Sequence, residues 1–213
     1  MTEAGGLRPS RGPGRPVGAD SAQTRATIKR AGCQIINERG YAALTFQEIA
    51  KRTGLSRPTL NYYFATRAAL YDSLVEDAAG VVNRCIDQAG QHDAPLNRLG
   101  ALVDALVDVW HRDPTMVAFL VSARLEAGRN PALPNASVSA VRGFLDDVVE
   151  HAIARDELPP HTQPGPIAEL LHAILWGVGA WAGCGRVPNP RLITRQLDQV
   201  LGRGLLADAE RGI

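Results

Sequence analysis

Apolar residues recur at helical spacing from about Ser21 almost to the end of the chain. In the first segment Ile28, Ala31, Ile35 and Ile36 fall on one helical face, and Gly40 ends that helix. No alternating run of apolar and polar residues is long enough to predict a strand, and no internal repeat is present. The pattern therefore predicts an all-α protein of about nine helices.

Two short helices should follow, each opened by a capping residue. Thr45 begins a capping box, in which its hydroxyl accepts from the third amide of the helix while Glu48 reaches back to the amide of Thr45. Gly54 stops this helix, and Ser56 caps the next one, where Pro58 is tolerated in the first turn. The residues expected to face inward are Phe46, Ile49, Ala50, Leu60 and Phe64.

A longer fourth helix should begin after Thr66 and break between Gly90 and Pro95. Proline-containing breaks then separate five further helices, which we place near residues 95–112, 114–128, 134–156, 164–184 and 190–208. The chain thus divides into a disordered basic arm (1–20), a small bundle that contains the two short helices (21–68) and a larger helical body (69–210).

The near-zero total charge hides a marked asymmetry along the chain. Residues 1–71 carry 11 Lys and Arg against 4 Asp and Glu, a net +7, whereas the remainder carries 12 against 18, a net −6. A basic end indicates a polyanionic partner, although two solvated surfaces that differ by chance would give the same numbers.

The two short helices, with a glycine turn between them, have the pattern of a helix-turn-helix. Such a motif presents the second helix to the DNA major groove. There Arg57 can hydrogen-bond to guanine, Asn61 can hydrogen-bond to adenine, and Thr59 can touch a thymine methyl group. Tyr62 and Tyr63 also lie off the inward face. A generic pair of packed helices is the alternative, and the local positive charge favours DNA binding over it.

From Thr24 to Val75 the chain resembles the DNA-binding domain of the tetracycline-repressor (TetR) family. The residues that carry the resemblance are Gly40-Tyr41, Thr45-Phe46, Ile49-Ala50, Gly54-Leu55-Ser56, Thr59-Leu60, Tyr63-Phe64, Arg67 and Leu70. The resemblance implies about nine helices, a symmetric dimer on a palindromic operator, and a variable body that binds a small effector. It also implies a repressor that the effector releases from DNA.

The resemblance assigns phosphate contacts to Thr45, Tyr63 and Arg67, with Arg67 in place of the usual lysine. An arginine keeps the charge and can fork across two phosphate oxygens. Two residues depart from the family: Pro58 replaces a small residue, and Asn61 replaces a tyrosine and either adds an adenine contact or is merely solvated. The predicted DNA-binding set is Thr45, Arg57, Pro58, Thr59, Asn61, Tyr62, Tyr63 and Arg67, with Arg11 and Arg15 from the arm.

The arm contains Arg11-Gly-Pro-Gly-Arg15-Pro, which resembles the Arg/Gly/Pro core of arms that enter the minor groove. A flexible arginine suits a narrow A·T minor groove because the potential there is most negative. A disordered tail whose arginines only add solubility is the alternative.

Aromatic residues with a few polar groups mark candidate walls of a ligand cavity in the body. The candidates are Trp110, Met116, Phe119, Arg124, Phe144, His172 and Trp176. Arg124 and His172 stand out, because a buried charge needs a partner or a ligand. The same residues could instead be plain core, and these two could be exposed or salt-bridged.

The last two expected helices are unusually apolar and suit a dimer interface. The candidate interface residues are Ile167, Leu171, Ile174, Leu175, Val178, Trp181, Leu197 and Leu201. Two such helices from each subunit can form a four-helix interface, which would set the recognition helices roughly 34–36 Å apart, one turn of DNA. A buried central helix within a monomer is the alternative.

The sequence contains few residues that would support another class of protein, such as a metalloprotein or an enzyme. Cys33, Cys85 and Cys184 have no zinc spacing, the five histidines form no HxxxH or HExxH pair, and no glycine-rich phosphate loop is present. We therefore expect no metal, no cofactor and no enzymatic activity. Residues 1–20 lack an apolar stretch, and the longest apolar region is too polar for a membrane span, so a cytoplasmic location is expected. The alternative functions are a helical ligand-binding or scaffold protein without DNA binding, or a helical enzyme.

Overall fold

The computed structural model describes residues 17–134, 136–159 and 161–183, and all of the regular secondary structure in this part of the chain is helical. Eight α-helices and one short 3-10 helix account for it: α1 (Val17–Arg39), η1 (Tyr41–Ala43), α2 (Phe46–Thr53), α3 (Arg57–Tyr63), α4 (Arg67–Ala89), α5 (Pro95–Arg112), α6 (Pro114–Arg129), α7 (Ala136–Ala154) and α8 (Pro164–Gly183). The all-α prediction is confirmed. The helix expected near 190–208 and most of the arm lie outside the described residues.

Helix α1 begins at Val17, four residues before the start expected from the apolar pattern, so the assignment of residues 17–20 to the disordered arm is wrong. The first turn carries Asp20, whose negative charge suits the positive end of the helix dipole. The Thr24 hydroxyl donates to the carbonyl of Asp20 at 2.7 Å. Apolar periodicity marks only the buried part of a helix, and from Asp20 onward the first buried residue of α1 is Ile28.

The predicted helix starts are confirmed by the capping hydrogen bonds. The side-chain oxygens of Thr45, Ser56 and Thr66 accept from the third amide of α2, α3 and α4 at 3.1, 3.2 and 3.0 Å. Gly54 ends α2 in the left-handed conformation, with φ of 71°, which a residue with a side chain adopts only at a cost. The turn between α2 and α3 therefore depends on glycine.

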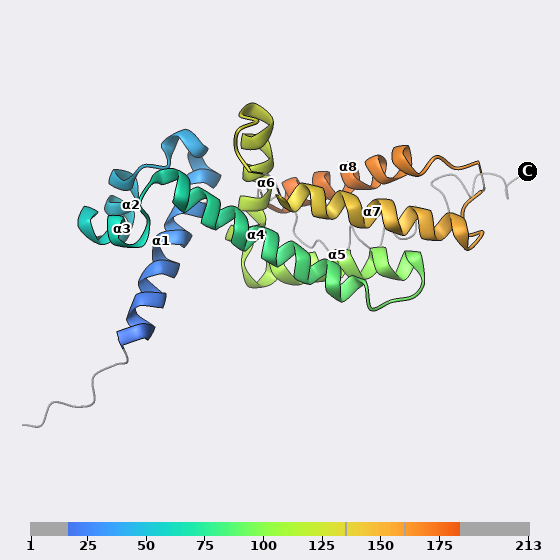
Figure 1. Cartoon of the computed structure of the whole chain (residues 1–213), viewed down its shortest axis with the longest axis horizontal. Helices are drawn as coiled ribbons and strands as arrows, with labels where there is room; N and C mark the ends of the chain where they lie inside the picture. The colour runs from blue at the N-terminus through green and yellow to red at the C-terminus, as the bar shows by residue number, and fades with distance from the viewer. Residues whose placement is uncertain (1–16, 135, 160, 184–213) are drawn as a thin grey trace, which may run out of the picture.

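Two hydrophobic cores share helix α4. The first core joins α1 to α3, the N-terminal half of α4 and α6, and includes Ile28, Ile49, Leu60, Tyr71 and Phe119. The second lies among the C-terminal half of α4, α5, α7 and α8, and includes Cys85, Leu102, Leu145 and Ala168. Figure 1 shows α1 to α3 gathered at one end, with α4 running from them into the body. This arrangement matches the expected bundle and body.

Helix α6 lies at the junction of the bundle and the body, where it packs against α1 and against α8 (Figure 1). The Asn37 side chain of α1 donates to the carbonyl of Thr115 at 3.0 Å. The close approach also brings the carboxylate of Glu126 against Gly40, where a Cβ atom would lie 2.7 Å from a carboxylate oxygen. In the part of the chain described, no helix combines the length and the hydropathy that crossing a bilayer requires.

Candidate nucleic-acid interface and ligand cavity

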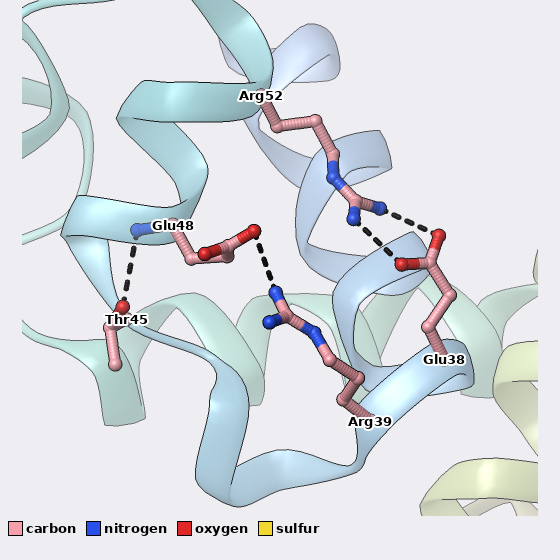
Figure 2. Close-up of polar contacts among 5 residues, drawn as sticks. All are labelled: Glu38, Arg39, Thr45, Glu48 and Arg52. Carbon is pink, nitrogen blue, oxygen red and sulfur yellow. Dashed lines mark hydrogen bonds and ion pairs between the residues drawn. The ribbon is translucent and has the colours of Figure 1, made fainter.

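Helix α2 is tied to the end of α1 by two ion pairs, which Figure 2 shows side by side. The guanidinium of Arg52 donates to both carboxylate oxygens of Glu38, at 2.8 and 2.7 Å. These hydrogen bonds hold the pKa of Glu38 below its usual value. Planar two-point contacts of this kind set orientation as well as distance, so they fix how α2 lies on α1.

The second ion pair corrects one detail of the predicted capping box. The Thr45 hydroxyl accepts from the amide of Glu48 as expected, but the Glu48 carboxylate does not turn back to the amide of Thr45. It lies 2.6 Å from a guanidinium nitrogen of Arg39 instead (Figure 2). An arginine from α1, close only in the folded chain, offers the carboxylate a charged partner in place of a neutral amide.

Helix α3 is held by its apolar side and presents its polar side outward. Leu60 is fully buried and Phe64 is nearly so, whereas Arg57, Asn61 and Tyr62 are exposed, Tyr62 by 82%. Among the other residues of the predicted DNA-binding set, Pro58, Thr45 and Arg67 are exposed and Thr59 and Tyr63 are half-buried. The outward face therefore carries the exposed hydrogen-bonding side chains of Arg57 and Asn61.

A shallow depression of about 330 Å³ connects this face with the start of α4. Its walls include Thr45, Arg57, Asn61 and Arg67, four members of the predicted DNA-binding set that are up to 22 positions apart in the chain. The guanidinium of Arg67 stacks over the ring of Tyr41 at 4.5 Å. Two cations and an amide on one surface, next to the starts of two helices, form a surface suited to a polyanion.

One residue that the sequence reasoning missed, Arg25 of α1, holds the end of α3. Its guanidinium lies 4.6 Å from the centre of the Phe64 ring and donates to the carbonyl of Tyr63 at 3.5 Å. The two partners are 38 and 39 residues away, so no local pattern could have identified this contact.

The body contains a largely apolar cavity of about 130 Å³ bordered by helices α4 to α8. Its walls are Val82, Leu106, Val117, Leu120, Val121, Val138, Val141, Leu175, Trp176 and Gly179, with Arg124, Ser137 and His172 as the polar members. The Arg124 guanidinium stacks over the Trp176 ring at 5.3 Å. Burial, with the nearby charges of Arg124 and Arg142, lowers the pKa of His172.

The structure brings three of the seven predicted cavity residues, Arg124, His172 and Trp176, to this cavity. Phe119 lies in the first core and Phe144 in the second. Met116 packs against the first core and borders a separate cleft beside α1 and α4. Trp110 is half-buried, with its ring 4.8 Å from that of His111. These four residues lie apart from the three that line the cavity.

The predicted dimer residues of α8 fall on two different faces of the helix. Leu171 and Leu175 turn inward, toward the second core, and Leu175 also lines the cavity. Trp181 is 64% exposed, and Leu170, which lies about three turns earlier on the same helix, is 56% exposed. Ile167, Ile174 and Val178 are half-buried. Leu197 and Leu201, like Arg11 and Arg15 of the arm, lie outside the described residues.

The residues that the structure describes offer no site for cysteine or histidine chemistry. They contain no group of three His, Cys, Asp or Glu side chains placed to hold a metal ion. Cys33 and Cys85 are buried free thiols, and burial raises the pKa of Cys33 to about 12. Cys184 lies outside this part of the chain.

Comparison with known sequences finds similarity at the bundle and, more weakly, beyond it. Residues 19–74 match the family described as "Bacterial regulatory proteins, tetR family". The chain is 38% identical over 50 residues to the class A tetracycline repressor from transposon 1721 of Escherichia coli, a match that spans 24% of this chain and 23% of that repressor. It is 21% identical over 162 residues to the transcriptional regulator UidR of Escherichia coli K12, covering 75% of this chain and 81% of UidR.

Comparison with solved structures extends the similarity over most of the chain. The regulator FadR from Bacillus subtilis, solved in complex with stearoyl-CoA, superposes with a TM-score of 0.69 at 15% identity, covering 84% of this chain and 98% of FadR. A gamma-butyrolactone receptor (ArpA-like protein) superposes with a TM-score of 0.69 at 22% identity, covering 87% and 89%. At these identities the similarity establishes a shared fold that includes the helical body.

Proposed function

The chain belongs to the TetR family of DNA-binding transcriptional regulators, and from this premise we propose that it is a repressor whose operator binding a small molecule reverses. The observation that carries the proposal is the outward polar face of α3, which stands on a buried apolar face. Arg57 and Asn61 of this face are the groups that would read base edges. We place the activity in the bacterial cytoplasm, where the DNA is.

Phosphate contacts would come from the edge of the same surface. The Thr45 hydroxyl accepts from the Glu48 amide, and its own hydrogen is left to donate to a phosphate oxygen. Arg67 is held over Tyr41 at the start of α4, and an arginine at this position can contact two phosphate oxygens. These groups would orient α3 in the major groove without reading sequence.

The proposed active form is a homodimer on a palindromic operator. The exposed apolar side chains of Leu170 and Trp181 on α8 support this, because large apolar side chains gathered on one exposed surface mark interaction sites. A two-fold axis through this face would pair two copies of α3, so that each reads one half-site of the operator.

Helix α6 is the proposed route from ligand to DNA. Val117, Leu120 and Val121 on this helix line the cavity, and Phe119 on its other side lies in the first core. A ligand that prefers a shifted α6 would therefore shift the bundle as well. A cavity of about 130 Å³ is far smaller than stearoyl-CoA, the molecule bound by the FadR of similar fold, so we propose a smaller effector here.

The test is a titration of fluorescent duplexes from the protein's own upstream region, followed by anisotropy, with a random duplex alongside. Arg57→Ala and Asn61→Ala should each weaken specific binding by about 1–3 kcal/mol, roughly 5- to 150-fold, and leave random DNA almost unaffected. Arg155→Ala and Asn83→Ala are matched controls, because both are exposed residues of the body. Equal losses on both duplexes, or none, would contradict base reading by α3.

A further inference from the structure

Arg124 lines the cavity and Arg142 lies close enough to affect His172, and only Arg142 has acidic partners. Arg142 of α7 pairs with Asp146 at 3.0 Å and with Glu169, and it donates to the carbonyl of Gly165 at 3.3 Å. Arg124 of α6 stacks on Trp176, and within the described residues it forms neither an ion pair nor a hydrogen bond. The wall of the cavity thus holds a guanidinium whose charge is not neutralised there.

The remaining wall offers this charge very little compensation. Apart from Ser137 and His172, the lining consists of aliphatic side chains, Trp176 and a glycine. A half-buried cation against apolar surface loses part of its hydration, and a contact with an aromatic ring replaces only some of it. A carboxylate on a bound molecule would supply the missing acceptor as a charge-assisted hydrogen bond.

His172 of α8 lines the same cavity and would respond to the same negative charge. The groups that surround it are Arg124 from α6 and Arg142 from α7, and Arg142 is already paired with Asp146 and Glu169. Burial and the two arginines lower the pKa of His172, so its surroundings favour neutral imidazole. An anion would oppose both effects and favour imidazolium, so its binding would take up a proton.

The volume of the cavity limits the size of the apolar group that can carry the carboxylate. A volume of about 130 Å³ is close to that of an engineered cavity of about 150 Å³ that binds benzene. We propose, building on the effector site of the proposed function, that the ligand is an apolar carboxylic acid of about one ring in size, with its carboxylate held between Arg124 and His172. The ring would lie among Val117, Val121 and Val141.

Calorimetry on the full chain tests the ligand class without any variant. The probes are benzoate and phenylacetate, with benzyl alcohol and benzylamine as neutral and cationic counterparts of similar shape. The carboxylates should bind about 10- to 100-fold more tightly than benzyl alcohol, and benzylamine more weakly still. Benzoate binding should weaken from about pH 6 to pH 8, and heats that differ between phosphate and Tris buffers should reveal proton uptake.

Matched variants test the two residues. Arg124→Met keeps the stem that covers Trp176 and removes the charge, so it should lower benzoate affinity by about 10- to 100-fold and leave benzyl alcohol unchanged. His172→Gln should abolish the buffer dependence of the heat. Arg129→Met is the control, because Arg129 lies on the same helix with its side chain 72% exposed. Thermal melts establish that each variant is folded.

The outcomes separate this inference from the proposed function. Equal affinity for benzoate and benzyl alcohol, or no carboxylate binding at millimolar concentrations, would overturn the ligand class and leave operator binding untouched. Benzoate that binds through Arg124 without weakening operator binding would support the site but remove its regulatory role. If the unmodified protein, with no ligand added, does not bind the operator, the proposed repressor function is contradicted. The carboxylate site is not affected by that result.

Discussion

The hydroxyl of Tyr71 is a buried polar group in the first core. Its ring lies edge-on between Tyr41 and Phe119, with centroids 4.8 and 6.3 Å away, and the side chain is fully buried. The hydroxyl has no hydrogen-bond partner among the residues that the structure describes. Burial, with the nearby charge of Glu126, raises the pKa of Tyr71 to about 12. A buried donor without an acceptor is a cost that the fold carries.

Tyr71→Phe should therefore raise the free energy of unfolding, by about 1 kcal/mol, because it removes the unpaired hydroxyl and keeps the ring. Urea denaturation measures the difference, and Tyr62→Phe is the matched control on an exposed ring. A clear loss of stability in Tyr71→Phe would show that the hydroxyl has a partner after all.

Because the pKa of Tyr71 is raised, the variant and the unmodified protein should also differ in how the free energy of unfolding depends on pH. The folded-state pKa, about 12, lies above the ordinary value of 10.0, so folding favours the neutral phenol. Its contribution to stability is complete below pH 10 and is lost as the pH rises from 10 through 12. Tyr71→Phe should lose less stability than the unmodified protein across that window.

Side-chain partners show where local sequence is informative. The capping roles of Thr45, Ser56 and Thr66 were predictable, because each partner lies three residues away. The pairing of Glu48 with Arg39 was not, since it depends on how α2 lies against α1. Contacts within one turn of helix can be read from the sequence, whereas contacts between helices need the packing.

At the scale of elements, α3 is a helix of seven residues that is anchored at both ends. Ser56 caps its start, and Arg25 reaches across from α1 to its end. A helix this short is not stable alone, so its orientation in the major groove depends on such anchors. Arg25 is therefore a positioning residue for the reading surface.

Arg25→Ala should weaken binding to the specific duplex about tenfold, because α3 loses its contact with α1 while the reading side chains stay. The salt dependence of binding should stay the same, since no phosphate contact is removed. Anisotropy titrations at several salt concentrations measure both quantities, with Arg30→Ala on the same helix as control. A slope that falls by about one, with sequence preference intact, would instead make Arg25 a phosphate ligand.

The order of the helices was predictable, but the partner of each helical face was not. The sequence marks Phe119 as a candidate wall of the cavity, yet it enters the first core, and its neighbour Leu120 borders the cavity instead. Helix α6 packs on two sides, against α1 and against α8, so periodicity along it does not tell which side borders a cavity. Met116 and Phe119 of this helix lie elsewhere for this reason. The short helix η1 has too few residues to show a period at all.

At the scale of the whole molecule, the exposed apolar face of α8 is expected to hold two copies together. Leu170→Glu combined with Trp181→Glu should yield a monomer by light scattering, because four buried like charges would face one another across the two-fold axis. Specific DNA affinity should fall with it, since one recognition helix then acts without the other. Leu96→Glu on α5 is the control, being an exposed leucine of the body. A double variant that remains dimeric would place the interface elsewhere.

Helix α4 belongs to both cores, and this shared membership turns a small motion into a larger one. Its 23 residues, at about 1.5 Å each, make a rod about 34 Å long. If one end is fixed in the body, a tilt of about 5° carries the other end, and the reading head attached to it, through about 3 Å. In a symmetric pair the two displacements add, and about 6 Å is a substantial fraction of a major groove roughly 12 Å wide. In the proposed dimer, a ligand the size of one ring would therefore change the spacing of the two bundles by tilting α4, without unfolding either.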